Sequence, residues 1–278
     1  MKHDDEGNLS ISGELKELDR GLVLYLDGTY DEVNGWFTDQ SGNGNHGIPY
    51  NGATTGTGIV GDGMSFDGTD DYISLNPDML DSASSGTVSM WVNIDSFDKL
   101  YNTLFVKGKG ASWAETHMAI LRHGGTSYMV CNIGDNSNGT SYEGTFGNPQ
   151  TLQTFVHMVA TWDGNYLKTY TNAALISSYE TSILPASDST YCYIGRGADG
   201  RTRETKMLAD EIRIYDRALE PEEIKQLYEL GCAKLHDGTN ASYDLGDLVV
   251  PEIIEGESKM KMTYQNLYCN EITEGVTF

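Results

Sequence analysis

Basic residues are scarce in this chain, and their scarcity limits what it can bind. Its 278 residues include 18 Lys and Arg against 41 Asp and Glu, which gives a formal net charge of -23 and a sequence pI of about 4.4. A surface this acidic repels phosphate backbones and anionic lipids. The composition therefore argues against nucleic-acid binding and against attachment to an anionic membrane.

Long apolar runs and cysteine motifs for metals are also missing. Residues 1–20 contain several acids and no apolar run, so we expect neither a secretory signal nor a transmembrane segment there. None of the four cysteines forms a CxxC pair, and the six His show no HExxH spacing. Zinc is therefore not expected, and we expect free buried thiols rather than a disulfide framework.

Short strands dominate what is present. Residues 87–94, TVSMWVNI, alternate in character and place Val88, Met90 and Val92 on one face, which is typical of a strand with one side in a core. Similar runs recur along most of the chain, and Gly, Asn, Asp and Ser fill most of the gaps between them. This arrangement predicts an all-β fold, an antiparallel two-sheet jelly-roll sandwich.

One helix is predicted near the end of the sequence. Pro221 suits a first helical turn, and the two glutamates that follow it lie at the positive end of the helix dipole. Apolar side chains at 224, 227 and 228 form a stripe, and Gly231 is placed to end the helix. We expect a short surface helix that packs against the sandwich.

A series of longer segments follows in a fixed order: GLVLYLDG, DQSGNGNHG, GDGMSFDGTDDYISL, TVSMWVNI, FVHMVATWDGNYLKTY and LADEIRIYDRALEPEEIKQLY. In this order they resemble the successive blocks of laminin G-like jelly rolls of the concanavalin A-like lectin and glucanase superfamily. The resemblance implies two stacked antiparallel sheets, often with one structural calcium ion. It divides the chain into an N-terminal arm (1–20), a jelly roll (21–231) and a C-terminal tail (232–278).

The turn FTDQSGNGNHG, residues 37–47, gathers carboxylate and amide oxygens on a glycine-rich loop. Calcium takes roughly six to eight oxygens from carboxylates, amides and backbone carbonyls. The resemblance implies that this turn lies against the last long strand. The predicted calcium ligands are Asp39, Asn43, Asn45 and Asp210, and Asp67 or Asp70 of a second acidic turn could join them. Ordinary turn chemistry of Asn, Asp and Gly is the alternative interpretation.

Aromatic side chains in polar loops are candidates for sugar binding. Lectin sites use an exposed aromatic platform beside polar groups that fix sugar hydroxyls. Trp36, Trp113 and Tyr142 stand in such loops, and packing of the loops is the alternative role for each.

Catalytic carboxylate pairs are not apparent. Retaining glucanases need a nucleophile and an acid about 5 Å apart, and the glucanases of this superfamily carry them in an E-x-D-x-E or E-x-D-x-x-E run. No such run and no GxSxG motif occurs in the sequence. We therefore expect no enzymatic activity, and a glycoside hydrolase is only the third hypothesis.

The ends of the chain complete the functional prediction. The opening GLVLYLD and the Gly-Asn turn resemble domains of tailed-phage virion proteins and bacterial surface proteins, and the C-terminal tail mixes acids with alternating apolar residues that could add strands to a neighbour. We predict a non-catalytic virion structural or decoration protein on a capsid or tail, anchored by its arms to other structural proteins in an oligomer or larger assembly. It would display a calcium-stabilised jelly roll to host glycans. The alternative is a carbohydrate-binding adhesin domain on a bacterial cell surface.

Overall fold

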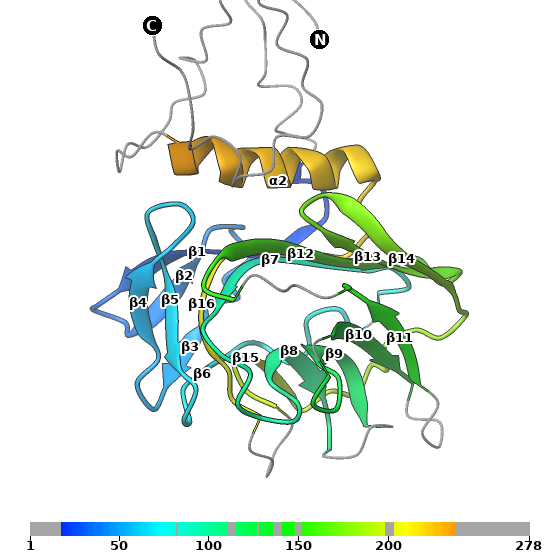
Figure 1. Ribbon diagram of the computed structural model, residues 1–278, viewed down its shortest axis with the longest axis horizontal. Helices are drawn as coiled ribbons and strands as arrows, with labels where there is room; N and C mark the ends of the chain where they lie inside the picture. Colours follow the sequence, from blue (N-terminus) through cyan, green and yellow to red (C-terminus); the bar gives the residue numbers. More distant parts are fainter. Residues whose placement is uncertain are drawn as a thin grey trace, which may run out of the picture.

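The described part of the chain folds into a sandwich of two antiparallel sheets, and a helix near the C-terminal end of this part lies on its outside (Figure 1). The computed structural model describes residues 18–81, 83–110, 115–126, 128–135, 141–147, 152–197 and 203–236. The all-β, two-sheet sandwich with a C-terminal helix that the sequence predicted is confirmed.

The larger sheet contains nine strands within the described ranges. Its main path runs β14-β13-β12-β7-β16-β1-β2, while β5 pairs with β16 and β4 pairs with β5. In that order the bounds are Ala174–Glu180, Tyr166–Thr171, Phe155–Trp162, Gly86–Ile94, Lys206–Tyr215, Leu22–Asp31, Trp36–Asp39, Asp62–Asp67 (β5) and Thr54–Thr57 (β4).

The smaller sheet contains seven strands of the described part of the chain, in the order β11-β10-β9-β8-β15-β6-β3. Strand β3 therefore forms one edge, and its neighbour β6 comes from a segment some twenty residues further on. In the same order the bounds are Ser141–Thr145, Met129–Gly134, Thr116–Arg122, Thr103–Gly108, Tyr191–Ile194, Tyr72–Ser74 and Ile48–Tyr50.

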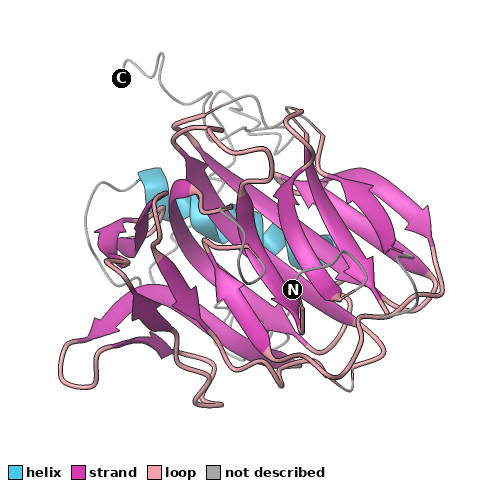
Figure 2. Cartoon of the chain, turned by 90° about the horizontal axis from the view of Figure 1, so that it is seen from below, coloured by secondary structure: helices cyan, strands magenta, loops and turns pink. Residues whose placement is uncertain are grey.

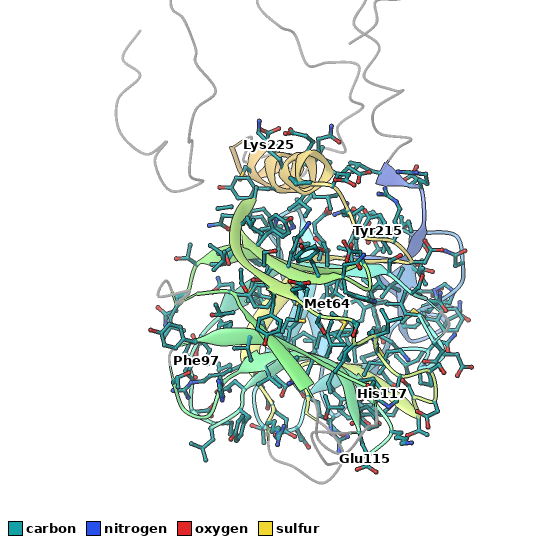
Figure 3. All side chains as sticks on the ribbon, turned by 90° about the vertical axis from the view of Figure 1, so that its right-hand side faces the viewer. Met64, Phe97, Glu115, His117, Tyr215 and Lys225 are labelled. Atoms are coloured by element: carbon teal, nitrogen blue, oxygen red, sulfur yellow. The ribbon has the colours of Figure 1, made fainter. Side chains whose placement is uncertain are left out.

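The main core fills the space between the sheets. Val88, Met90 and Val92 belong to it and are at most 1% exposed, which confirms the alternation predicted for residues 87–94. Met64 lies near its centre (Figure 3). Ser89 and Trp91 point to the opposite face of β7, yet they too are buried. A second layer must therefore cover that face.

Helix α2, Pro221–His236, provides this layer over the outer face of the larger sheet, and in Figure 2 it lies behind the strands. Ile224 and Leu227 are buried against Tyr215 and its neighbours, whereas Lys225 lies on the outer side (Figure 3). The predicted apolar stripe thus faces the sheet. None of the helical segments described is long and apolar enough to cross a membrane.

Gly231 lies inside this helix rather than at its end. The helix continues to His236, so the predicted end at Gly231 is wrong. A Cβ at this position would lie 2.6 Å from atoms of the Trp91 indole, closer than side chains can approach. The glycine is therefore required for close packing between helix and sheet. From the sequence alone, this role cannot be told apart from helix termination.

The cysteines follow the prediction only in part. Cys131 and Cys192 are free and buried, as expected, and burial raises the pKa of both thiols. Cys232 in α2 is disulfide-bonded, so the expectation of free thiols is wrong there. Cys269 lies outside the described residues.

Candidate functional site

Asp39 holds the Gly-Asn turn together from inside. Its Oδ1 accepts the backbone N–H groups of Tyr25 and Ser41 at 2.9 Å each, and its Oδ2 accepts the Ser41 hydroxyl at 2.8 Å and the N–H of Asn45 at 2.9 Å. Burial alone would raise the pKa of this carboxyl, but these hydrogen bonds hold it below its usual range. Both oxygens of Asp39 are therefore engaged in shaping the turn.

The two asparagines fasten the turn to strand β1. Asn43 donates from Nδ2 to the carbonyl of Leu22 at 2.9 Å, and Asn45 donates to the carbonyl of Val23 at 3.0 Å. The Oδ1 of Asn45 accepts a hydrogen bond from Asn76 at 3.2 Å. The structure brings the three predicted ligands of this turn together, and ordinary turn chemistry accounts for the contacts they make.

Asp210 lies apart from that turn. Strand β1 stands between β16 and β2, since Leu26 pairs with Ile212 on one side and with Asp39 on the other. Adjacent strands lie about 4.8 Å apart, so β16 and β2 are about 10 Å apart at this register. The expected approach of Asp210 to the Gly-Asn turn is therefore wrong.

Asp210 instead occupies a bulge where β16 changes its neighbour, from β5 at residues 206–209 to β1 at residues 212–215. Its carboxylate accepts the N–H of Val60 at 2.9 Å and that of Glu211 at 2.7 Å. Burial, together with the charge of Glu211, raises the pKa of Asp210 to about 8. This acid joins the β4–β5 hairpin to the sheet and has a structural role.

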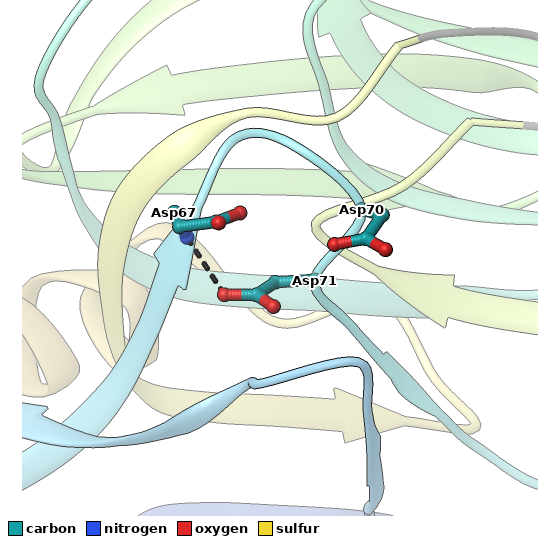
Figure 4. Close-up of side chains that lie close together, drawn as sticks. All are labelled: Asp67, Asp70 and Asp71. Carbon is teal, nitrogen blue, oxygen red and sulfur yellow. Dashed lines mark hydrogen bonds between the residues drawn. The ribbon is translucent and has the colours of Figure 1, made fainter.

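A second acidic turn, between β5 and β6, gathers three carboxylates (Figure 4). Asp67, Asp70 and Asp71 each offer an oxygen, and these oxygens lie within 4.8 Å of one another. Asp67 and Asp70 are exposed, whereas Asp71 is buried and accepts the N–H of Asp67 at 2.8 Å. The structure thus places the two predicted ligands side by side and adds Asp71, which was not among them.

The electrostatics of this turn suit a hard cation. A hydrogen bond from the Thr69 backbone lowers the pKa of Asp67, while burial raises that of Asp71. Clustered carboxylate oxygens are the donors that calcium prefers. Asn51 donates from Nδ2 to the carbonyl of Asp70 at 2.9 Å, which fastens the turn to the end of β3.

Trp36 packs against its own loop. Its indole stacks on His46, with 4.4 Å between the ring centroids and 7° between the planes, and His46 Nδ1 accepts the N–H of Asp39 at 3.1 Å. One face of this predicted sugar platform is therefore covered by the Gly-Asn turn. Trp113 and the side chain of Tyr142 lie outside the described residues.

A row of aromatic rings, not predicted from the sequence, lies on the outer face of the smaller sheet. Tyr50 and Tyr72 pair directly across β3 and β6, and their rings stack with 4.8 Å between centroids and 5° between planes. Tyr193 of β15 meets Tyr72 edge-on at 5.2 Å and 70°. We call Tyr50, Tyr72 and Tyr193 the tyrosine row. Their neighbours Ile73 and Ile194 point the other way, into the core.

The guanidinium group of Arg196 packs on two rings of this row. Its Cζ atom lies 4.6 Å from the ring centroid of Tyr72 and 5.5 Å from that of Tyr193, which are cation–π distances. At the sheet edge, Tyr50 is 45% exposed and Ile48 beside it is 37% exposed. The row therefore presents a rigid aromatic surface whose outer end is open to solvent.

Each strand of the row carries a local signal in the sequence. The runs DYISL and YCYIG place a tyrosine next to an isoleucine of the core, and IPY places Tyr50 next to the half-buried Pro49. The sequence does not show that β3, β6 and β15 lie side by side, because these strands are far apart along the chain. Only the pairing of the sheet turns three separate tyrosines into one surface.

Solved structures with this fold include the binding domains of a mosquitocidal protein and of botulinum neurotoxins. The binding domain of Paraclostridial Mosquitocidal Protein 1 aligns with a TM-score of 0.62 at 16% identity, over 77% of this chain and 53% of that structure. The binding domain of botulinum neurotoxin DC aligns in its complex with SialylT (TM-score 0.60, 14% identity) and in its complex with rat synaptotagmin II (0.60, 15%). Both alignments cover 77% of this chain and 52% of the other. The chain thus spans about half the length of these structures, and the likeness concerns the fold.

No curated protein matches the sequence. A laminin G family model, described as the concanavalin A-like lectin/glucanases superfamily, matches residues 67–225, which is more than half of the chain. These residues run from the acidic turn to the start of α2 and include most strands of both sheets. The chain therefore belongs to the laminin G-like branch of the concanavalin A-like lectin/glucanase superfamily.

Proposed function

We propose that this chain is a non-catalytic carbohydrate-binding domain that displays its jelly roll on a surface. The tyrosine row is the observation that supports this function. Sugar rings have apolar C–H faces that pack on aromatic rings, and well-placed polar groups then fix their orientation. Tyr50 offers an exposed ring, Tyr72 and Arg196 hold the surface rigid, and the tyrosine hydroxyls can exchange hydrogen bonds with a sugar.

The solved structures are consistent with a binding role for this fold. The botulinum neurotoxin DC domain has been determined in complex with SialylT and, separately, with rat synaptotagmin II. We extend only the idea of surface recognition to this chain. The residues that would carry recognition here are its own.

The proposal includes a location. We place the domain on the surface of a virion, on the capsid or tail, where its terminal arms would contact other structural proteins in a larger assembly. The acidic composition and the resemblance of its opening segments to domains of tailed-phage proteins support this placement. An adhesin on a bacterial cell surface is the alternative, and it would use the same binding face.

We also propose a structural calcium ion, at the acidic turn rather than at the Gly-Asn turn. Asp67, Asp70 and Asp71 supply clustered oxygens, whereas Asp39 already accepts four hydrogen bonds. The ion would neutralise part of the mutual repulsion of the carboxylates and hold the turn beside the tyrosine row. It would stabilise this turn and take no part in chemistry.

A glycan array tests the proposed function. The wild-type chain is compared with Tyr50→Ala and Tyr72→Ala, and with Tyr166→Ala as a control, because Tyr166 is 41% exposed but lies on the larger sheet. The loss of one stacking ring should weaken binding roughly three- to tenfold. The control should bind like the wild type, and chelator should lower the melting temperature. Silence of a folded wild-type chain on the array would refute the function, and an equal loss in all three variants would refute the assignment to the row.

A further inference from the structure

We infer that the glycan bound at the tyrosine row is electrically neutral, and that the carboxylates beside the row exclude acidic sugars when no calcium ion is bound to them. This inference rests on the proposed function and names the class of ligand. It is carried by the position of the acidic turn relative to the aromatic surface.

The acidic turn flanks the row at the ends of β3 and β6. Asp71 directly precedes Tyr72, and Asn51, the residue after Tyr50, donates its side-chain hydrogen bond to the carbonyl of Asp70 at 2.9 Å. The carboxylate of Asp71 also packs beside Gly52, where a Cβ would come within 2.8 Å of Oδ1. Tyr50 stacks on one face of the Tyr72 ring and Arg196 lies over that ring as well, so a sugar would stack on the exposed ring of Tyr50, beside this turn.

Negative charge exceeds positive charge at this flank of the row. The described acidic groups are Asp67, Asp70 and Asp71, and the first two are exposed. Two described cations lie beside the row or the turn. Arg196 lies over the tyrosine rings. Lys206 stands opposite Asp67 on the neighbouring strand, but its Nζ lies 2.9 Å from the carboxylate of Asp95. Lys206 is therefore balanced by an acid of its own, and the chain as a whole carries a formal charge of -23. This balance describes the turn without the proposed calcium ion, which would offset two of the three carboxylate charges.

Electrostatics then select against anionic ligands. Charges interact over about 8 Å at physiological ionic strength, so a sialic acid carboxylate or a sulfate near Tyr50 would be repelled by the acidic turn. Two like unit charges about 7 Å apart in water weaken binding roughly two- to threefold per pair before salt screening. A neutral sugar meets no such repulsion, and its hydroxyls can donate hydrogen bonds to Asp70.

Calorimetric titration with matched ligands tests this inference. A neutral oligosaccharide that binds on the array is compared with the same oligosaccharide carrying a terminal sialic acid, in buffer with chelator so that no cation screens the carboxylates. The variant Asp67→Asn/Asp70→Asn removes two exposed charges, and the amide oxygen that it introduces at position 67 can still accept the hydrogen bond from the Thr69 N–H. Glu222→Gln/Glu229→Gln makes the same charge change on exposed positions of α2, on the opposite face of the sandwich.

Only the sialylated ligand should gain affinity from the substitution of the carboxylates. The wild-type chain should bind the sialylated form at least roughly threefold more weakly than the neutral form, and Asp67→Asn/Asp70→Asn should remove most of that difference without tightening the neutral ligand. The α2 variant should leave the difference intact. Tighter binding of the sialylated form to the wild type would overturn the inference while leaving carbohydrate binding in place. Failure of every glycan to bind would overturn the proposed function itself.

Discussion

Replacement of Gly231 by alanine should destabilise the protein, although the same change stabilises most helices. Gly231 lies within α2, and a Cβ there would lie 2.6 Å from Cε2, Cζ2 and Nε1 of Trp91. Trp91 is only 1% exposed, and its ring is also stacked on Tyr228 and His157, so it has little room to move.

Two opposing effects determine the magnitude. Glycine in a helix interior is about 1 kcal/mol less favourable than alanine, so propensity alone favours the variant. An extra methyl group in a close-packed contact costs about 1 to 3 kcal/mol through displaced side chains and backbone. Because the contact is with a rigid ring and not with the end of a flexible chain, we expect overpacking to win by about 1 kcal/mol.

Urea unfolding followed by circular dichroism gives the free energy of unfolding for Gly231→Ala, for Trp91→Phe and for the double variant. The smaller ring of Trp91→Phe should relieve the clash, so Gly231→Ala should be neutral or stabilising in that background, a coupling between the two positions. Lys225→Ala, on the exposed side of the same helix, is the control and should change stability by less than about 0.5 kcal/mol. A Gly231→Ala protein that is more stable than the wild type would show that the ring moves aside and that the packing argument is wrong.

Two further changes test buried polar groups. The pKa of Asp210 is about 8 in the folded state, which is above its value in the unfolded state. The folded state therefore binds this proton more tightly than the unfolded state does. The free energy of unfolding of the wild type should fall as the pH rises from about 4 to 8. Asp210→Asn should lose less stability than the wild type between pH 5 and pH 9, and parallel unfolding curves would contradict this. Asn132 is 1% exposed, and neither atom of its side-chain amide has a hydrogen-bond partner among the described residues, so Asn132→Leu should raise the free energy of unfolding by about 1 kcal/mol. A decrease of that size in urea titrations would mean that the amide has a partner.

The sheets could be predicted well because their signal is local. The alternation at Val88, Met90 and Val92 states which face of β7 meets the core, whatever strand lies beside it. The start of α2 at Pro221 was equally local, because it depends on residues within one helical turn.

The candidate site could be predicted only in fragments. Composition alone identified the acidic turn at Asp67 and Asp70, but it could not reveal that Asp71 turns inward or that Tyr50 and Tyr72 lie beside it. The proposed link between Asp39 and Asp210 failed because one strand stands between them, a matter of sheet order. Local composition does not encode that order.

The sequence by itself determined the class of fold, the acidic surface and the start of the helix, because each depends on composition or on neighbours within a few residues. The tertiary structure alone decided that Tyr50, Tyr72 and Tyr193 form one surface and that Gly231 makes room for Trp91. These contacts join strands and a helix that are distant in the chain. Their free energy comes from burial and packing across elements, so no single segment carries the information for them.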